Sequence, residues 1–448
     1  MKTYYTNATI YRGGRFETGC LAVEHGRVVT AGEPRPGDRI VDLGGLCLVP
    51  GLVDVHVHLR EPGFPQKETI ATGTAAAARG GYTTVCSMPN LCPAPDTPAT
   101  LGEQLAIIRR DAAVRVKPYG TITMGQRGCG ELVDFAALAP EVVGFSDDGR
   151  GVQSDELMEE AMRRAAAVGK PIVAHCEVDE LLRGGYIHDG DYCREHGHRG
   201  ICSESEWRPI QRDLELVRET GCGYHVCHIS TKESVALIRK AKVEGLNVTC
   251  ETGPHYLLLD DSVYYQEDYS ASARYICAPP MRKKEDQAVL WKALANGSIQ
   301  TVSTDHCSFT LKQKDAGRGD FTKIPGGLPG VETRGEVVCT IAENENKLSL
   351  AGVCRALSEN PAKLYGLFPR KGVIAPGSDA DIVVYDPGAS HVLRGTELLS
   401  KAGYTPFEGF RTNGGVSKVY LRGELQVDGG KVVGGKRGEY LKRGKCAL

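Results

Sequence analysis

Residues 52–58 read LVDVHVH and have the pattern of a strand that ends in two metal-ligand side chains. Because side chains alternate between the two faces of a strand, His56 and His58 point to the same face. Seven further short apolar runs follow at intervals of about 32 residues, which is the length of one β-strand and α-helix unit. The sequence therefore predicts a repeated β/α architecture that begins here.

The apolar runs alternate with segments of helical spacing, such as residues 156–168, 206–220 and 232–244. Eight consecutive β/α units close into a barrel, so we predict an α/β fold with a (β/α)8 TIM-type barrel over residues 51–366. The predicted barrel strands are residues 52–58, 82–88, 114–121, 142–147, 171–175, 223–228, 246–251 and 299–305.

The competing α/β fold is an open, doubly wound sheet. Such a sheet would carry a glycine-rich phosphate loop after an early strand. Neither G-x-G-x-x-G nor G-x-x-x-x-G-K-[ST] follows any of the eight runs, so the pattern favours the barrel.

The two ends of the chain differ from the middle. Short strands separated by glycine turns are predicted between residues 6 and 30, and again between residues 380 and 427. We interpret residues 1–50 and 367–448 as two parts of one small composite β-sandwich domain.

Composition excludes a disordered, a collagen-like and a coiled-coil protein. The chain has 448 residues, of which 41% are hydrophobic and 25% charged, so it can bury a sizeable core. Its 54 basic and 56 acidic residues give a net charge of −2, which disfavours a nucleic acid or a membrane surface as partner. The 16 cysteines are scattered without a C-x-x-C motif, and no signal peptide or long apolar run is visible. We expect a cytoplasmic protein whose cysteines serve as small core residues.

Polar side chains that can bind metals stand at the ends of the predicted strands. The carboxyl ends of barrel strands meet at one face, where catalytic residues gather. Two imidazoles from one strand, joined by histidines and carboxylates from others, argue against the alternative in which each is an ordinary core residue. The residues in these positions are His56, His58, Asn90, Asp147, Asp148, His175, His228 and Asp305.

The number and type of these side chains suit a pair of metal ions. Nitrogen and oxygen ligands fit Zn²⁺, and Mn²⁺, Fe²⁺ and Co²⁺ are compatible with them as well. One catalytic zinc needs three protein ligands and an open position, whereas four histidines and two aspartates suit two bridged metals. Because such a pair lowers the pKa of bound water and polarises a carbonyl, the predicted chemistry is metal-assisted hydrolysis of an amide.

Three other histidines have simpler interpretations. His225 is at odd spacing from His228, so we expect it to face away from the barrel interior. His306 follows Asp305 and is expected to point away in the same manner. His255 follows the seventh predicted strand, and the sequence leaves open whether it lines the pocket.

These motifs also carry a family resemblance. Residues 54–63 (DVHVHLREPG) resemble the signature of dihydroorotase within the cyclic amidohydrolases of the amidohydrolase superfamily. The similarity spans nearly the whole chain. It continues through residues 87–90 (SMPN), 145–149 (FSDDG), 174–177 (AHCE), 224–234 (YHVCHISTKES), 303–306 (STDH) and 377–383 (GSDADIV).

The resemblance implies two zinc ions bridged by a carboxylate and a hydroxide. Many relatives use a carboxylated lysine as the bridge, but no lysine occurs between residues 141 and 150. In the bacterial branch that the chain resembles, the second aspartate of the FSDDG motif takes that role, so Asp148 is the expected bridge and Asp147 would face away. The other implied ligands are His56, His58 and Asp305 for one zinc and His175 and His228 for the other.

The resemblance also implies a reaction and roles for further residues. The reaction would be the reversible hydrolysis of L-dihydroorotate to N-carbamoyl-L-aspartate in pyrimidine biosynthesis. Asp305 would act as general base on the water and then as general acid towards the leaving nitrogen. Arg60 and Asn90 would hold the ring carboxylate of the substrate. Gly326 and Gly327 are further expected substrate contacts.

The chain departs from the dihydroorotase pattern at two positions. Phe309 and Ala278 stand where a histidine and an asparagine usually contact the substrate carboxylate. Residues 303–309 and 321–332 look more like dihydropyrimidinase and hydantoinase, whose substrates are neutral rings. The alternative is therefore one of these activities or the hydrolysis of another cyclic ureide.

Arg60 is the residue on which the choice of substrate depends. A buried arginine needs an anion, which a carboxylated cyclic ureide would supply unless Arg60 pairs with Glu61 or a neighbouring carboxylate. We therefore expect a dihydroorotase, and a possible homodimer. A non-catalytic dihydroorotase-like scaffold would be marked by lost metal ligands, and all six are present.

Overall fold

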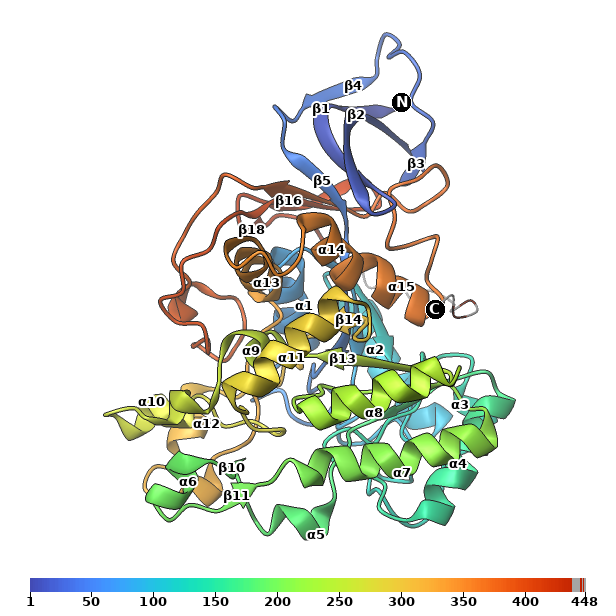
Figure 1. Cartoon of the computed structure of the whole chain (residues 1–448). Coiled ribbons are helices and arrows are strands. Elements are labelled where there is room, and N and C mark those ends of the chain that lie inside the picture. Colours follow the sequence, from blue (N-terminus) through green and yellow to red (C-terminus); the bar gives the residue numbers. More distant parts are fainter. Residues whose placement is uncertain (437–443, 445, 447–448) are drawn as a thin grey trace.

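Parallel strands in the middle of the chain form the predicted barrel (Figure 1). The barrel strands are β6 Leu52–Val57, β7 Tyr82–Ser87, β8 Arg115–Pro118, β9 Ile172–Ala174, β12 Tyr224–Val226, β13 Val248–Thr252 and β14 Thr301–Val302. They pair as β6-β7-β8 and as β14-β13-β12-β9. A parallel bridge between Val57 and His306 joins the two ends of the ring. The computed structural model describes residues 1–436, 444 and 446.

The fourth predicted strand, residues 142–147, is not a regular strand. Only Phe145 forms parallel bridges, to Gly120 on one side and to Ile172 on the other. The neighbouring chain segments offer few donors, because Pro118 and Pro171 have no backbone N–H. The amide of Phe145 still donates to the carbonyl of Pro171 at 3.1 Å, so the segment keeps the fourth place in the ring.

Three long helices begin within two residues of their predicted starts: α4 Asp155–Ala167, α7 Glu204–Thr220 and α8 Lys232–Val243. Side-chain caps explain two of these starts, since the hydroxyls of Ser154 and Thr231 accept backbone amides of the first turns of α4 and α8.

The remaining helices lie on the outside of the barrel and in its loops. In the part of the chain described, no helix combines the length and the apolar composition needed to cross a bilayer. Short strands β10 Ile187–His188 and β11 Gly200–Ile201 pair within one loop. The other helices are α1 Ile70–Arg79, α2 Pro98–Asp111, α3 Phe135–Leu138, α5 Asp179–Leu182, α6 Asp191–Glu195, α9 Pro254–Leu258, α10 Tyr269–Ala273, α11 Lys284–Ala295, α12 Leu311–Asp315, α13 Arg334–Asn344, α14 Leu350–Cys354 and α15 Asn360–Leu364.

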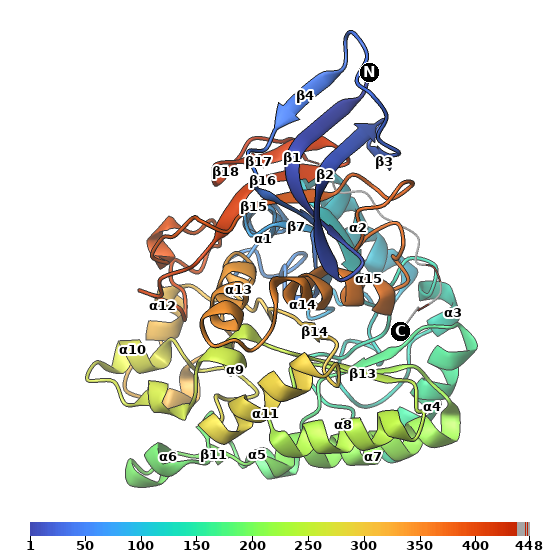
Figure 2. The same cartoon turned by 45° about the horizontal axis from the view of Figure 1, so that its top comes forward.

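Both ends of the chain contribute to one nine-stranded sheet (Figure 2). Its strands are β1 Thr3–Arg12, β2 Arg15–Glu24, β3 Arg27–Val29, β4 Arg39–Asp42, β5 Cys47–Pro50, β15 Ile382–Asp386, β16 Gly415–Leu421, β17 Glu424–Asp428 and β18 Lys431–Val432. The antiparallel pairing of β5 with β15 joins the two ends. Residues from both ends, such as Ile10, Leu48 and Ile382, share a core separate from that of the barrel. The exact domain limits stay a prediction.

A buried ion pair ties the first barrel strand to the last. The Nη1 of Arg334 lies 3.5 Å from Oδ1 of Asp54, and neither side chain is exposed to solvent. The guanidinium also donates to the carbonyls of Val302 and Val53, at 2.6 and 3.2 Å. Oδ1 of Asp54 accepts the amide of Thr304 at 3.2 Å. These contacts link β6 and β14 where the ring closes.

We predict that Arg334→Met lowers the free energy of unfolding by about 3 to 5 kcal/mol, because Asp54 would keep a buried charge without a partner. Urea unfolding followed by circular dichroism measures the change. The control is Arg163→Met, which removes an exposed ion pair with Glu159 on α4 and should cost less than about 1 kcal/mol. Equal unfolding midpoints for the two variants would contradict the closing role of Arg334.

Candidate metal centre

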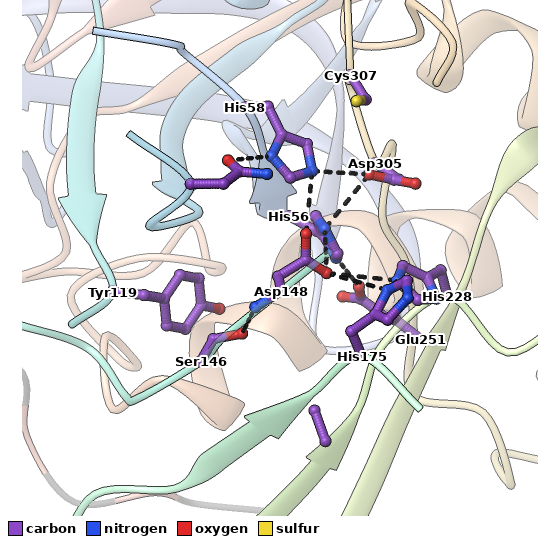
Figure 3. A network of polar contacts seen from close by, with 12 residues as sticks. His56, His58, Tyr119, Ser146, Asp148, His175, His228, Glu251, Asp305 and Cys307 are labelled. Carbon is purple, nitrogen blue, oxygen red and sulfur yellow. Dashed lines mark hydrogen bonds and ion pairs between the residues drawn. The ribbon is translucent and has the colours of Figure 1, made fainter. Parts of the chain in front are cut away.

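The six predicted metal ligands meet beyond the carboxyl ends of the barrel strands (Figure 3). All six are buried. Their ligand atoms form groups in which every atom lies within 4.8 Å of the others. One group is His56, His58 and Asp305, and another is Asp148, His175 and His228.

Asp148 faces both groups with its two oxygens. Its Oδ1 lies 3.4 Å from Nε2 of His228 and 3.6 Å from Nδ1 of His175. The same oxygen is 3.4 Å from Nε2 of His56, and Oδ2 is 3.4 Å from Nε2 of His58. A carboxylate in this position can contact two cations at once, one through each oxygen.

Asp305 also lies next to His56 and His58. Its Oδ1 is 3.0 Å from Nε2 of His58 and 3.3 Å from Nε2 of His56. Asp305 and His228 have positive φ angles of 45° and 31°, and Arg60 has 61°. Residues other than glycine rarely adopt this conformation, which tends to be retained where a functional side chain must point in a particular direction.

Three of the four histidines are held by an acceptor on the nitrogen that faces away from the cluster. The pairs are His56 Nδ1 with Glu251 Oε1 at 2.7 Å, His58 Nδ1 with Asn90 Oδ1 at 2.7 Å and His175 Nε2 with Glu177 Oε2 at 3.1 Å. Such partners fix the orientation and tautomer of the ring, so the other nitrogen is presented to the cluster as a ligand.

The charges of the cluster compensate one another. Burial by itself would raise the pKa of both aspartates. His56, His175 and His228 nevertheless hold the pKa of Asp148 well below its usual range. His56 and His58 likewise lower the pKa of Asp305 to about 2. Burial would lower the pKa of His175, yet Asp148 and Glu177 raise it to about 10. Both carboxylates are therefore ionised and available as ligands.

Two orphaned atoms show that these residues fit a metal ion. His56 Nε2 and Asp148 Oδ1 are buried and have no hydrogen-bond partner among the described residues. Buried polar atoms nearly always have one, so a cation that contacts both atoms would satisfy them. Imidazole nitrogens and carboxylate oxygens are a donor set that Zn²⁺ and similar divalent ions accept.

Arg60, expected to hold the substrate carboxylate, is buried near the cluster. Its Nη2 donates to Sγ of Cys307 at 2.7 Å, and its Cζ lies 5.6 Å from the ring centroid of Phe309. The alternative pairing with Glu61 is wrong, because no ion pair joins the two side chains, and Oε2 of Glu61 instead accepts the amide of Ile70 at the start of α1. Within residues 1–436, 444 and 446, Arg60 forms no ion pair.

The glycines expected to contact substrate lie beside the same cysteine. Gly327 has a φ of 143°, and a Cβ there would lie 2.5 Å from Sγ of Cys307. Only glycine permits this approach. A Cβ added to Gly326 would lie 3.7 Å from the backbone nitrogen of Ala278. Ala278, where the chain departs from the dihydroorotase pattern, therefore lies beside the expected substrate contacts.

The expectation that His225 faces away from the barrel interior is wrong. Its Nε2 lies 3.2 Å from Oε2 of Glu251, and Glu251 also contacts His56 inside the barrel. Its Nδ1 lies 2.8 Å from the hydroxyl of Thr249. Counting back by twos from His228 fails because His228, with positive φ, does not continue the alternation of the strand.

Asp147 and His306 point away from the cluster, as predicted, and His255 is buried near it. Asp147 turns away from the cluster and accepts the amide of Thr123. His306 also points elsewhere, and its Nε2 lies 3.2 Å from Oε2 of Glu68. His255 is buried, with its Nε2 unpartnered among the described residues. Burial lowers the pKa of His255 to about 4, against an opposing effect of Asp305 nearby.

Sequence reasoning missed three residues of the site. Cys227, taken as a core residue, lies in a ligand group with His56 and Asp148. Burial raises the pKa of its thiol. Glu251 and Glu177 accept hydrogen bonds from His56 and His175, on the ring nitrogens that face away from the cluster. The sequence could have indicated these two glutamates, since Glu251 ends a predicted strand and Glu177 follows His175 by two residues.

Known proteins are similar to this chain over most of its length. A family model for dihydro-orotase-like proteins matches residues 45–234. The dihydroorotase of Geobacillus thermodenitrificans is 42% identical over 416 residues, which cover 92% of this chain and 95% of that protein. The dihydroorotase of Ligilactobacillus salivarius is 40% identical over 441 residues, which cover 96% of this chain and 99% of that protein.

Solved structures show the same fold. A dihydropyrimidinase from Brevibacillus agri is 28% identical, with a TM-score of 0.88 over 100% of both chains. A D-hydantoinase is 30% identical, with a TM-score of 0.90 over 99% of both chains. By its relatives, its fold and its buried cluster of histidines and aspartates, the chain belongs to the dihydroorotase family of metal-dependent cyclic amidohydrolases.

Proposed function

We propose that the chain is a dihydroorotase, which hydrolyses the cyclic amide of L-dihydroorotate reversibly to N-carbamoyl-L-aspartate in pyrimidine biosynthesis. Buried Arg60, which forms no ion pair with any described residue, is the observation that carries this assignment. An arginine in such a place needs an anion, and dihydroorotate has a ring carboxylate whereas dihydrouracil has none. Relatives named dihydroorotase, at 40 to 43% identity, support the same choice.

We further propose that the cluster holds two Zn²⁺ ions. When bound, the metal pair would lower the pKa of water and polarise the ring carbonyl of the substrate. The nitrogens held from behind by acceptors need no rearrangement to serve as ligands. The residues that would hold the ions are His56, His58 and Asp305 for one, His175 and His228 for the other, and Asp148 between them.

Asp305 is the proposed general base and general acid. Figure 3 shows one of its oxygens towards His58 and the other directed away from the histidines. The second oxygen can take a proton from the attacking water and return it to the leaving nitrogen, provided that both come within hydrogen-bond reach.

Arg60 and Asn90 would hold the ring carboxylate. The Oδ1 of Asn90 is engaged by His58 Nδ1 at 2.7 Å, which leaves the amide NH₂ as the group that can donate to substrate. Asn90 would thus orient a metal ligand and the substrate together. Gly326 and Gly327 would let the main chain approach the ring closely.

The substrate is accordingly a small carboxylated cyclic ureide, and the composition favours a cytoplasmic reaction without nucleic acid or membrane.

One observation favours a second candidate, the hydrolysis of neutral rings as in dihydropyrimidinase. Phe309 puts an apolar ring 5.6 Å from the Arg60 guanidinium, where dihydroorotases usually have a histidine.

Turnover of four substrates separates the two candidates. With L-dihydroorotate, dihydrouracil, hydantoin and allantoin assayed side by side, we expect kcat/KM for dihydroorotate to exceed the others by at least about 100-fold, since only its carboxylate satisfies Arg60. Faster hydrolysis of dihydrouracil or hydantoin would instead establish the second candidate.

Asp305→Ala should reduce kcat at least about 100-fold, because proton transfer would lose its carboxylate. The metal content, measured by inductively coupled plasma mass spectrometry, should stay near that of the parent enzyme, because His56, His58 and Asp148 would remain as ligands of the first ion. Asp315→Ala, at an exposed position of α12, is the control and should retain full activity. Turnover by Asp305→Ala at the parent rate would rule out the acid and base role.

Asp148→Ala should lower the bound metal to one ion per chain or fewer after dialysis, because the carboxylate that faces both ligand groups would be gone. Metal analysis of the purified variant measures this. Two tightly held ions per chain in Asp148→Ala would refute the bridging assignment.

A further inference from the structure

A second cation lies beside Arg60 at the wall of the site. The Nζ of Lys67 is 5.0 Å from the ring centroid of Phe309, and the Arg60 Cζ is 5.6 Å from the same centroid. Lys67 also lies 4.6 Å from the ring centroid of Phe64. Across the described part of the chain, Lys67 forms no ion pair with a carboxylate. Two positive groups thus share one aromatic ring without an anion.

The backbone holds Lys67 against the loop that carries Asp305. The amide of Lys67 donates to the carbonyl of Phe64 at 3.0 Å. Its own carbonyl accepts the hydroxyl of Ser308 at 3.2 Å, three residues beyond Asp305. Partial burial lowers the pKa of Lys67, and the charge of Arg60 lowers it further. Bringing these cations together costs free energy that a bound anion would recover.

A third cation near the Phe309 ring, Lys314, is already hydrogen-bonded to the backbone. Its Nζ is 5.9 Å from the centroid of Phe309, but it donates to the carbonyls of Ile276 and Pro325 at 2.7 and 2.8 Å. Lys314 therefore ties two loops of the wall together. Lys67, whose ammonium contacts aromatic rings, is the cation left for a ligand.

We propose that Lys67 binds the ring carboxylate of the substrate together with Arg60. It would supply a hydrogen-bond donor to the carboxylate, which Phe309 and Ala278 do not offer at their positions. The inference rests on the proposed function, because it requires a carboxylated ring. A lysine that only packs on Phe64 and Phe309 would stabilise the loop but would not distinguish charged from neutral rings.

Steady-state kinetics of Lys67→Met test the proposal. KM for L-dihydroorotate should rise about tenfold, the effect of losing one charge-assisted contact, while kcat changes less than about twofold. The methyl ester of L-dihydroorotate, assayed as a competitor, has the same ring without the charge, so its inhibition constant should not change. Lys67→Arg keeps the charge and should restore KM to within about threefold of the parent.

Lys363→Met is the control at a second lysine that lies against an aromatic ring, although Lys363 also pairs with Glu359 at 2.8 Å. The Lys363 Nζ lies 5.2 Å from the ring centroid of Phe368, and the residue belongs to α15, away from the site. Its KM values should equal those of the parent enzyme. An unchanged KM in Lys67→Met, or equal weakening of the acid and the ester, would overturn the role of Lys67 alone. Absence of dihydroorotate turnover in the parent enzyme would overturn the proposed function and this inference with it.

Discussion

Two buried carboxylates, Asp148 and Asp305, lie among four buried imidazoles, and the rest of the site accommodates this arrangement. Ionised groups taken out of water need partners, and an isolated one would cost many kcal/mol. The acceptors behind three histidines decide which ring nitrogen faces the carboxylates. The positive φ angles of Asp305 and His228 direct their side chains inward. Donor set, orientation and burial together make this a place for divalent cations.

Closure of the barrel and construction of the site use the same atoms. Oδ1 of Asp54 accepts the amide of His56 at 3.2 Å, and it also takes part in the contacts with Arg334 and Thr304 that join β6 to β14. His56 lies in β6, and His58 and Asp305 follow the ends of β6 and β14, two strands that are far apart in the sequence. Since one buried carboxylate holds both strand ends, the distance between the ligands depends on the closing contact.

The substrate side depends on segments that the barrel pattern does not contain. The hydroxyl of Ser400, from the segment between β15 and β16, donates to Oε2 of Glu68 at 3.0 Å. Glu68 in turn contacts His306, next to Asp305. The terminal β-domain therefore reaches the catalytic face through one long loop. The wall around Cys307 gathers positive charge from Arg60 and Lys67, although the chain as a whole is nearly neutral.

The repeat of apolar runs was enough to predict the barrel, and the spacing of His56 and His58 pointed to a cluster of histidines and aspartates at the strand ends, because strand periodicity is a local property of the chain. Local patterns could not reveal the irregular fourth strand, which lacks donors from two distant prolines, or the inward position of His225, which depends on one backbone angle. Nor could they reveal that Glu61 caps a helix while Arg60 and Lys67 stay without a carboxylate partner among the described residues. These features depend on contacts between residues remote in sequence, and only the tertiary structure decides which charged groups meet.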